Sequence, residues 1–233
     1  MDDWYPTTVA ANLPAAEELI ELVLELGGTP LVGGHQAPGQ YVRLRLPDQP
    51  ALGEGIFAIA SAPGPQVHRW EFLLKGGSPL ADRLMRLTPG ERVDSSVPSG
   101  RGFPLHQARG KGVLLFATGS GISPIRSVIE SIRQERAAFG PVTLYFGART
   151  PRAFAYEDEL QHWEAAGIRV VRTVSQPGAS DWQGLNGYVQ AHLAEQAVED
   201  HVAFVCGQSS MVQGVMDALH ARGLPRESIH LNY

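Results

Sequence analysis

The hydrophobic pattern of this 233-residue chain changes its period near residue 109. Before that point, short segments alternate apolar and polar residues, as in YVRLRL at 41–46, which is typical of a β-strand with one buried face. Beyond it, unbroken apolar runs such as VLLFA at 113–117 are followed by apolar residues three and four positions apart. Because each pattern keeps to its own half, the sequence predicts two domains, which a chain of this length can hold.

The first half contains several strand candidates and a single helix candidate. Breaks that contain Gly and Pro separate the strands, and Pro79 stands where the first turn of a helix tolerates proline. This arrangement predicts a small antiparallel barrel. The strands are predicted at residues 18–26, 41–46, 55–60 and 70–75, and the helix at 79–87.

The second half alternates strand and helix candidates. The alternation predicts a parallel sheet with helices on both faces, and ligands at the carboxyl ends of its strands. Residues 106–112 are the predicted linker between the halves. The strands are predicted at 113–117, 142–146, 168–174 and 202–205, and the helices around 125–132, 157–166, 187–196 and 210–222.

Charge and cysteine content argue against several classes of protein. A net charge of −5 with scattered basic residues provides no surface for nucleic acid or an anionic membrane. The single cysteine, Cys206, excludes a disulfide framework and a four-cysteine metal or iron–sulfur site within the chain, and favours a reducing, cytoplasmic setting. The start carries no signal-peptide pattern, no apolar run reaches the length of a membrane span, and the eight histidines lack metal-binding spacing.

The sharpest local pattern is TGSGISP at 118–124, between the first strand and the first helix of the second half. Gly119 and Gly121 permit a tight turn and a close approach of the backbone to a phosphate. The helix that follows would direct its free N–H groups and positive dipole end at a pyrophosphate. Pro124 replaces the third glycine of the usual fingerprint, so a plain strand-to-helix turn is the alternative. The position at a strand–helix junction favours a dinucleotide site.

Further candidate residues stand at the ends of predicted strands and of the chain. Cys206 and Gly207 close a later strand at the same sheet edge, although a lone cysteine there is often only a buried apolar residue. Arg149 follows the second strand, where the ribose end of a nucleotide would lie, or is an ordinary solvated side chain. Tyr233 ends the chain and can pack on the surface or stack on a planar ring.

Six segments, taken in order, resemble those of one known family. They are GQYV at 39–42, FAIASAP at 57–63, FLLK with Gly77 and Ser78, PSGRGF at 98–103, TGSGISP at 118–124, and CG with Met211. Together they resemble the ferredoxin–NADP⁺ reductase superfamily over nearly the whole chain, nearest to a plant and cyanobacterial branch with a FLAIAS flavin strand. The resemblance implies a Greek-key flavin-binding barrel over residues 1–108, an NAD(P)-binding α/β domain over 109–233, bound FAD, and NADPH or NADH as electron donor.

The same resemblance implies a set of site residues. Phe57 would stack on the flavin ring, and Tyr156, in a YxxE pattern with Glu159, would lie near the adenosine ribose. Cys206 would orient the nicotinamide without acting as a nucleophile, and Tyr233 would cover the flavin until the nicotinamide displaces it. The catalytic residues implied are Cys206 and Tyr233, no metal site is expected, and the cofactor-binding residues are Phe57, Ala58, Ile59, Ala60, Ser61, Leu74, Lys75, Gly77, Ser78, Thr118, Gly119, Ser120, Gly121, Ile122, Ser123, Arg149, Tyr156, Gly207, Gln208 and Met211.

The chain departs from the family's flavin strand at two important positions. The family pattern RxYS corresponds here to Gly55, Phe57 and Ala58. The arginine normally pairs with the FAD pyrophosphate in a charge-assisted contact, and the serine hydroxyl normally lies near the flavin N5 atom. Phe57 can still stack on the ring and backbone N–H groups can still bond its edge. The sequence therefore predicts FAD that binds more weakly than is usual for the family.

The expected electron acceptor is a separate protein or a small molecule, because the chain lacks the cysteines of an appended ferredoxin domain. Arg149 and Arg152 could meet a 2′-phosphate, which favours NADPH slightly over NADH. Two other classes of function stay open: a flavin-deficient, nucleotide-binding regulatory module, and an electron-transfer subunit that acts only with a partner protein. A hydrolase is disfavoured, since the sequence has no G-x-S-x-G motif.

Overall fold

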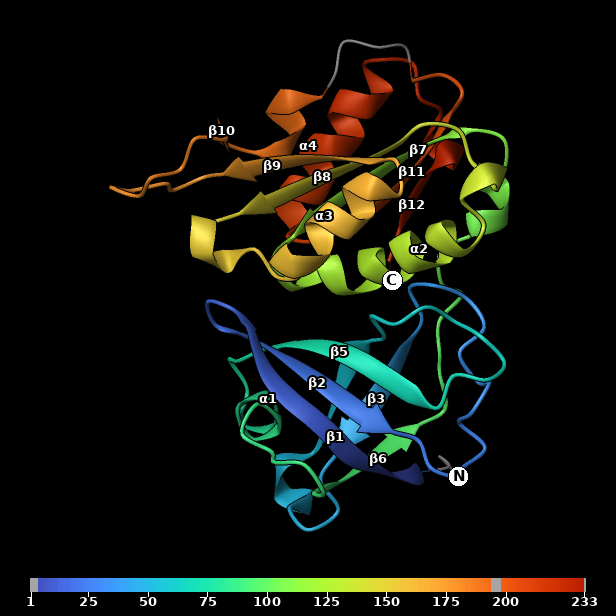
Figure 1. Cartoon of the computed structure of the whole chain (residues 1–233), viewed down its shortest axis with the longest axis vertical. Coiled ribbons are helices and arrows are strands. Elements are labelled where there is room, and N and C mark those ends of the chain that lie inside the picture. The colour runs from blue at the N-terminus through green and yellow to red at the C-terminus, as the bar shows by residue number, and fades with distance from the viewer. Residues whose placement is uncertain (1–3, 194–197, 233) are drawn as a thin grey trace.

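A computed structural model of the chain describes residues 4–193 and 198–232. Two six-stranded sheets form the two halves of the molecule, with the N-terminal half below and the C-terminal half above in Figure 1. Helix α2 (Ile122–Gln134) lies on the side of the upper sheet that faces the lower half (Figure 1). The two-sheet architecture confirms the predicted fold class.

The first sheet is antiparallel, with the strand order β4-β3-β6-β1-β2-β5. Its two edges approach each other where the N–H of Ala60 donates to the carbonyl of Glu71 at 2.7 Å, which makes the sheet barrel-like. Trp70, Phe72 and Leu22 are fully buried in its core. The elements are β1 (Trp4–Ala16), β2 (Leu19–Glu25), β3 (Tyr41–Arg45), β4 (Glu54–Ala58), β5 (Arg69–Lys75), α1 (Pro79–Leu84) and β6 (Arg92–Ser96).

Two strands of this sheet, β1 and β6, were not predicted. Pro6 and Pro14 interrupt β1, and prolines remove backbone donors and weaken a strand pattern. The structure forms β1 because it pairs with β2 on one side and with β6 on the other. Tertiary pairing therefore overrides the weak local signal.

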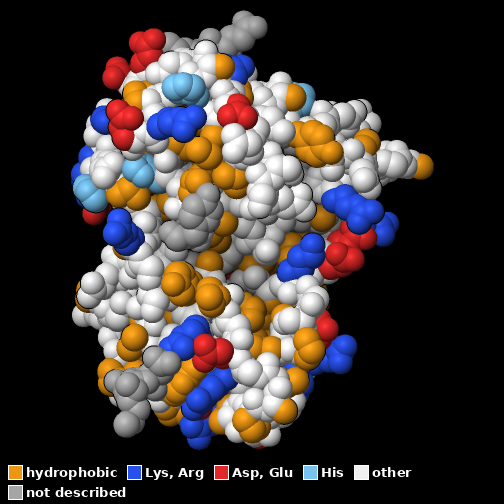
Figure 2. All heavy atoms as spheres, turned by 180° about the vertical axis from the view of Figure 1, so that it is seen from behind, with side chains coloured by type: hydrophobic (Ala, Val, Ile, Leu, Met, Phe, Trp, Pro, Cys, Tyr) orange, Lys and Arg blue, Asp and Glu red, His pale blue; other side chains and the backbone are white. Residues whose placement is uncertain are grey.

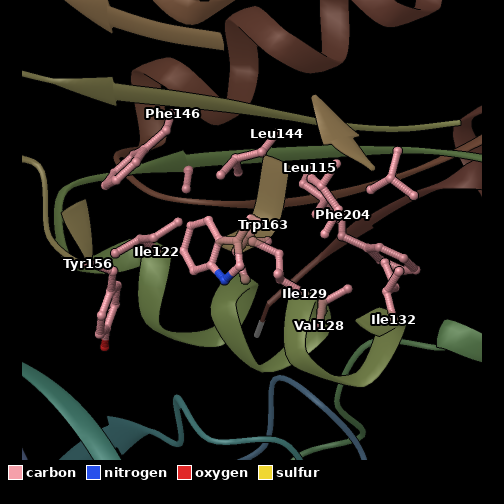
Figure 3. Close-up of a cluster of buried hydrophobic side chains, with 14 of the residues drawn as sticks. Leu115, Ile122, Val128, Ile129, Ile132, Leu144, Phe146, Tyr156, Trp163 and Phe204 are labelled. Carbon is pink, nitrogen blue, oxygen red and sulfur yellow. The ribbon is translucent and has the colours of Figure 1, made fainter. Parts of the chain in front are cut away.

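The second sheet is parallel throughout, with the order β10-β9-β8-β7-β11-β12. Alternate residues of β7 enter different cores: Leu115 packs with α2 and α3, and Leu114 packs with α4. In Figure 3, Ile129 of α2 and Trp163 of α3 lie against Leu144 of β8. The elements are β7 (Gly112–Thr118), β8 (Val142–Ala148), α3 (Glu157–Ala165), β9 (Ile168–Val174), β10 (Leu185–Asn186), β11 (His201–Cys206), α4 (Ser209–His220) and β12 (Ile229–Leu231).

The helix predicted at 187–196 is wrong over the part that the structure describes. Only a 3₁₀ turn forms there, Val189–His192, and Leu193 already has extended backbone angles. Residues 194–197 lie outside the described residues. Val189 and Leu193 are both buried and lie four positions apart, which is the spacing of apolar residues on one face of a helix. In the structure they lie at the two ends of a turn instead.

Residues 97–111 connect the two sheets, and the predicted boundary between 108 and 109 stays a prediction. Four apolar residues from before that boundary join the buried cluster of the second half: Leu19, Leu73, Phe103 and Ala108. The ring of Phe103 lies 5.1 Å from that of Phe204 on β11. The two halves therefore share apolar contacts as well as a covalent connection.

An acidic cluster also lies where the halves meet. Glu21 of β2 and Glu71 of β5 approach Glu159 of α3, with Arg126 of α2 among them. Burial, and then repulsion from Glu71 and Glu159, raise the pKa of Glu21, while Arg126 acts in the opposite direction. The folded protein therefore disfavours the charged form of Glu21.

Replacing Glu21 with glutamine should stabilise the protein at neutral pH, because an amide removes this repulsion. A carboxyl with a raised folded pKa stabilises fully below its unfolded pKa of about 4.3, and the contribution is lost as the pH rises through the folded value. Thermal unfolding should give Glu21→Gln a melting temperature above the parent's at pH 7.5, by about 2–4 °C per ~1 kcal/mol of relief. The difference should shrink at pH 5.

Glu25→Gln is the matched control on the same strand. Glu25 pairs with Arg69 at 2.7 Å on the surface, so its loss relieves no repulsion and should raise no melting temperature. Equal melting temperatures for Glu21→Gln and the parent at pH 7.5 would show that the cluster carries no such strain.

Candidate functional site

The loops that follow β7 and β11 touch each other at the carboxyl edge of the parallel sheet. A Cβ atom added at Gly121 would lie 2.5 Å from the carbonyl oxygen of Cys206, and one at Gly207 would collide with the Thr118 hydroxyl. The N–H of Gln208 also donates to that hydroxyl at 3.2 Å. Only glycine permits so close an approach of two backbones, so these glycines join the predicted nucleotide residues into one surface.

Gly119 gives this surface an open side. Its φ of +55° is left-handed, and an added Cβ would meet nothing within 4 Å. Helix α2, 13 residues long, begins directly after the loop at Ile122. A glycine turn with open space beside it, followed by a helix N-terminus, suits the pyrophosphate of a dinucleotide.

Cys206 lies half-buried beside this loop. Burial raises the pKa of its thiol to about 11, partly opposed by a hydrogen bond with the side chain of Asn232. The group is therefore a neutral thiol at physiological pH, which agrees with an orienting role and opposes a nucleophilic one. No motif in the sequence marked Asn232.

Arg149 follows β8 and is exposed at the same sheet edge. Its Nε atom donates to the side-chain oxygen of Gln176, which follows β9, at 2.9 Å. The arginine is thus held across the ends of two neighbouring strands, with its terminal nitrogens in position to meet a further anion.

The residues of the predicted flavin strand, 57–61, begin in β4, which ends at Ala58, and they pack directly on the start of α2. The hydroxyl of Ser123 donates to the carbonyl of Ala58 at 3.1 Å. The N–H groups of Ile59 and Ala60 donate to the carbonyls of Gln40 and Glu71, so these two amides do not bond a flavin edge in this arrangement. The predicted flavin and nucleotide residues nevertheless come together at one junction.

The Phe57 ring occupies the space where a side chain at position 55 would begin. A Cβ at Gly55 would lie 2.9 Å from that ring and 3.2 Å from Leu80 of α1. An arginine at this position would force the ring to move. The absence of the family's arginine and the orientation of Phe57 are therefore linked.

The predicted pyrophosphate residues fit an anion in part. Lys75 is exposed at the end of β5, and Gly77, with φ of +121°, has open space around it. The N–H of Gly77, however, donates to the carboxylate of Asp82 at 3.0 Å, and Ser78 caps α1 by accepting from Ala81. The open space at Gly77 and the positive charge of Lys75 suit the pyrophosphate of FAD, whereas the negative charge of Asp82 repels it. This combination agrees with the expected weak binding of FAD.

A cavity of about 500 Å³ adjoins these residues. Lys75 and Arg86 line it together with Glu18 and Asp82, so its charges are mixed. Figure 2 shows the opposite face of the molecule from Figure 1, where the surface is hollowed between the two halves.

Tyr156 does not join the loops at the sheet edge. It is 7% exposed, its hydroxyl has no hydrogen-bond partner, and Arg126 lies over its ring at 4.8 Å. Figure 3 shows the hydroxyl pointing toward the first half of the molecule. Its predicted contact with the adenosine ribose stays a prediction, and the predicted role of Tyr233 falls outside the described residues.

Two other features are absent from residues 4–193 and 198–232. None of the helices described there has the length and apolar character needed to cross a membrane. Within the same ranges, no three His, Cys, Asp or Glu side chains gather as metal ligands would.

The chain is similar to known proteins over most of its length. Residues 115–217 match the family described as the oxidoreductase NAD-binding domain. The fruit protein pKIWI502 of Actinidia deliciosa is 33% identical, covering 97% of this chain and 76% of that protein. Ferredoxin–NADP reductase B of Sorangium cellulosum is 34% identical, covering 83% of each. The fold is similar, with a TM-score of 0.79 and 18% identity over the full length of both chains, to a ferredoxin NADP⁺ reductase from Neisseria gonorrhoeae with bound FAD and NADP.

Gly121→Ala should weaken nucleotide binding, because the added methyl group would push the two sheet-edge loops apart. Overpacking of this kind costs about 1–3 kcal/mol, and each ~1.4 kcal/mol that falls on binding raises a Kd about tenfold. Calorimetric titration with NADP⁺ should therefore show a Kd about 5- to 150-fold higher when the cost falls on binding. The control is Gly28→Ala, where an added Cβ meets nothing within 4 Å. An unchanged Kd in Gly121→Ala would remove this loop from the site.

Proposed function

Since the chain belongs to the ferredoxin–NADP⁺ reductase-like family of FAD- and NAD(P)-binding oxidoreductases, we propose that it moves electrons from NADPH or NADH to a separate acceptor, with FAD as its bound cofactor. The enzyme class is NAD(P)H-dependent flavoprotein reductase. The observation that carries the proposal is the hydrogen bond from Ser123 to Ala58, because it joins the nucleotide loop directly to the flavin strand.

The residues of the second half hold the nucleotide in this proposal. Residues 118–123 receive the pyrophosphate on an open glycine turn and a helix N-terminus. The neutral thiol of Cys206 orients the nicotinamide, and Gly207, Gln208 and Met211 shape the floor beneath it. Arg149 meets the ribose end of the nucleotide.

The residues of the first half hold the flavin. Phe57 supplies an aromatic surface, Ala58 to Ser61 line the ring, and Lys75, Gly77 and Ser78 approach the pyrophosphate. Bound FAD supplies a carrier that takes two electrons with hydride and releases them to one-electron or two-electron acceptors. The protein contributes alignment and exclusion of water. We assign the flavin to residues 1–108 and the nucleotide to residues 109–233.

The proposed electron acceptor is not part of these 233 residues. One cysteine among 233 residues cannot ligate a four-cysteine iron–sulfur cluster, so a separate protein or a small molecule receives the electrons. The same cysteine content supports a cytoplasmic location.

One structural feature favours a second candidate function. The carboxylate of Asp82 holds the Gly77 N–H that a flavin pyrophosphate would otherwise use, and no arginine stands at position 55. A flavin-deficient regulatory module that binds only the nucleotide would have this arrangement.

A visible absorption spectrum separates the two functions. We expect freshly purified protein, or protein supplied with FAD, to show flavin absorption that bleaches anaerobically on addition of NADPH or NADH. Protein that takes up no FAD but still binds nucleotide would overturn the reductase and establish the regulatory module.

Arg149→Ala should weaken NADPH binding without affecting NADH. A hydrogen bond to a charged group contributes about 1.5–3 kcal/mol, so the Kd for NADPH should rise about tenfold or more. Anaerobic titration of flavin bleaching measures both nucleotides. Arg169→Ala is the control, because Arg169 is exposed near the start of β9, at the opposite end of the strand from its carboxyl edge. A parallel loss for NADH and NADPH would assign Arg149 to a part of the site that both nucleotides share.

A further inference from the structure

One face of α2 holds the flavin strand. Ser123, Arg126 and Ser127, spaced i, i+3 and i+4, lie side by side on the helix. Their side chains donate to three carbonyls of that strand: Ser123 to Ala58 at 3.1 Å, Arg126 to Ala60 at 3.3 Å, and Ser127 to Ser61 at 2.8 Å. The helix that follows the nucleotide loop therefore also hydrogen-bonds the backbone that is expected to line the flavin.

Arg126 also binds side chains on two more elements. Its Nε and Nη2 atoms bond the carboxylate of Glu159 on α3 at 2.8–3.0 Å, and its Nη1 atom bonds Glu71 on β5. The side chain is 11% exposed, and it lies over the ring of Tyr156. One planar guanidinium therefore connects the flavin strand, β5, α2 and α3, which uses the fork geometry that lysine lacks.

Stability alone is a poor explanation for this buried charge. Desolvation of an ion pair usually costs about as much as the pair gains, so buried pairs are weak evidence of stabilisation. The arrangement does fix the relative orientation of the elements, because the guanidinium N–H groups point in fixed directions and bond oxygen atoms that belong to different elements. The four connected elements can then take only one relative position.

We propose that Arg126 is a positioning residue that sets the spacing between the flavin strand and the nucleotide loop. The inference rests on the proposed function and adds a residue that is not itself assigned to either cofactor but that contacts the flavin strand through the Ala60 carbonyl. Arg126 acts through the Ala60 carbonyl on one side and through α2 on the other.

Spacing affects hydride transfer and nucleotide affinity differently. A displacement of about 1 Å between reacting groups can cost about 100-fold in rate. The nucleotide loop itself keeps its glycine contacts when Arg126 is replaced, so the nucleotide affinity should change little. A loss of spacing therefore lowers the limiting rate of flavin reduction and leaves the nucleotide Kd nearly unchanged.

The test compares FAD-loaded Arg126→Met and Arg126→Lys with Arg133→Met. Arg133 lies on the same helix and pairs with Glu130 on the surface at 2.7 Å, so its variant controls for loss of an arginine from α2. Stopped-flow bleaching gives the limiting rate, titration with NADP⁺ gives the Kd, and hydrogen exchange reports the amides of Ile59 and Ala60 without nucleotide.

For Arg126→Met we expect a limiting rate about 10- to 100-fold lower, a Kd within about threefold of the parent's, and faster exchange at Ile59 and Ala60. Arg126→Lys keeps the positive charge but loses the planar set of N–H donors, so its limiting rate should lie between those of Arg126→Met and the parent. A limiting rate within about threefold of the parent's, or an equal loss in rate and affinity, would overturn the proposal.

Ser127→Ala covers the case in which Arg126→Met does not fold. It removes only the bond to the Ser61 carbonyl, and should lower the limiting rate in the same direction by a smaller factor; an unchanged rate would count against the proposal. If the parent shows no flavin reduction at all, the proposed function fails. The positioning role of Arg126 is then tested by hydrogen exchange at Ile59 and Ala60 alone. Faster exchange in Arg126→Met than in Arg133→Met supports it, and equal exchange overturns it.

Discussion

Three hydrogen bonds from one face of α2 to the carbonyls of residues 58–61 determine how the two halves of the protein meet. The helix is rigid, and its first residue follows the glycine turn that is proposed to receive the nucleotide. Any motion of the flavin strand relative to that turn must therefore break one of these bonds or bend the helix. Apolar contacts such as that between Phe103 and Phe204 bring the halves together, and the directional bonds select one arrangement among those that burial alone would permit.

The nucleotide side of the junction depends on a second constraint, the absence of side chains. Gly121 lies against the Cys206 carbonyl, and Gly207 lies against Thr118, so two loops that are far apart in sequence form one surface. On the flavin side a side chain occupies the expected binding position, because Asp82 places a negative charge beside the Gly77 amide. The proposed nucleotide surface is therefore closely packed, and the proposed flavin surface has a weaker electrostatic contribution. We expect most of the flavin affinity to come from shape and apolar contact.

The sequence predicted best where the local pattern and the tertiary environment agree. The apolar run of β7 and the glycines that follow it could be assigned because burial on both faces leaves no polar residue in a strand. Strand β1 could not, since its prolines hide a pairing that only its neighbours supply. The cluster around Arg126 was missed for a related reason. Glu71, Arg126 and Glu159 are separated by tens of residues, and no spacing rule connects an arginine with carboxylates on other elements. Tyr156 was assigned from its motif, which could not reveal that its ring would be buried.

We propose that nicotinamide and flavin meet in one fixed orientation at this junction. The decisive measurement is anaerobic stopped-flow reduction of the FAD-loaded protein with nucleotide deuterated at either face of the nicotinamide C4. Flavin bleaching should slow with deuterium on one face and be unaffected by deuterium on the other. A flavin that stays oxidised, or an equal effect from both labelled faces, would contradict it.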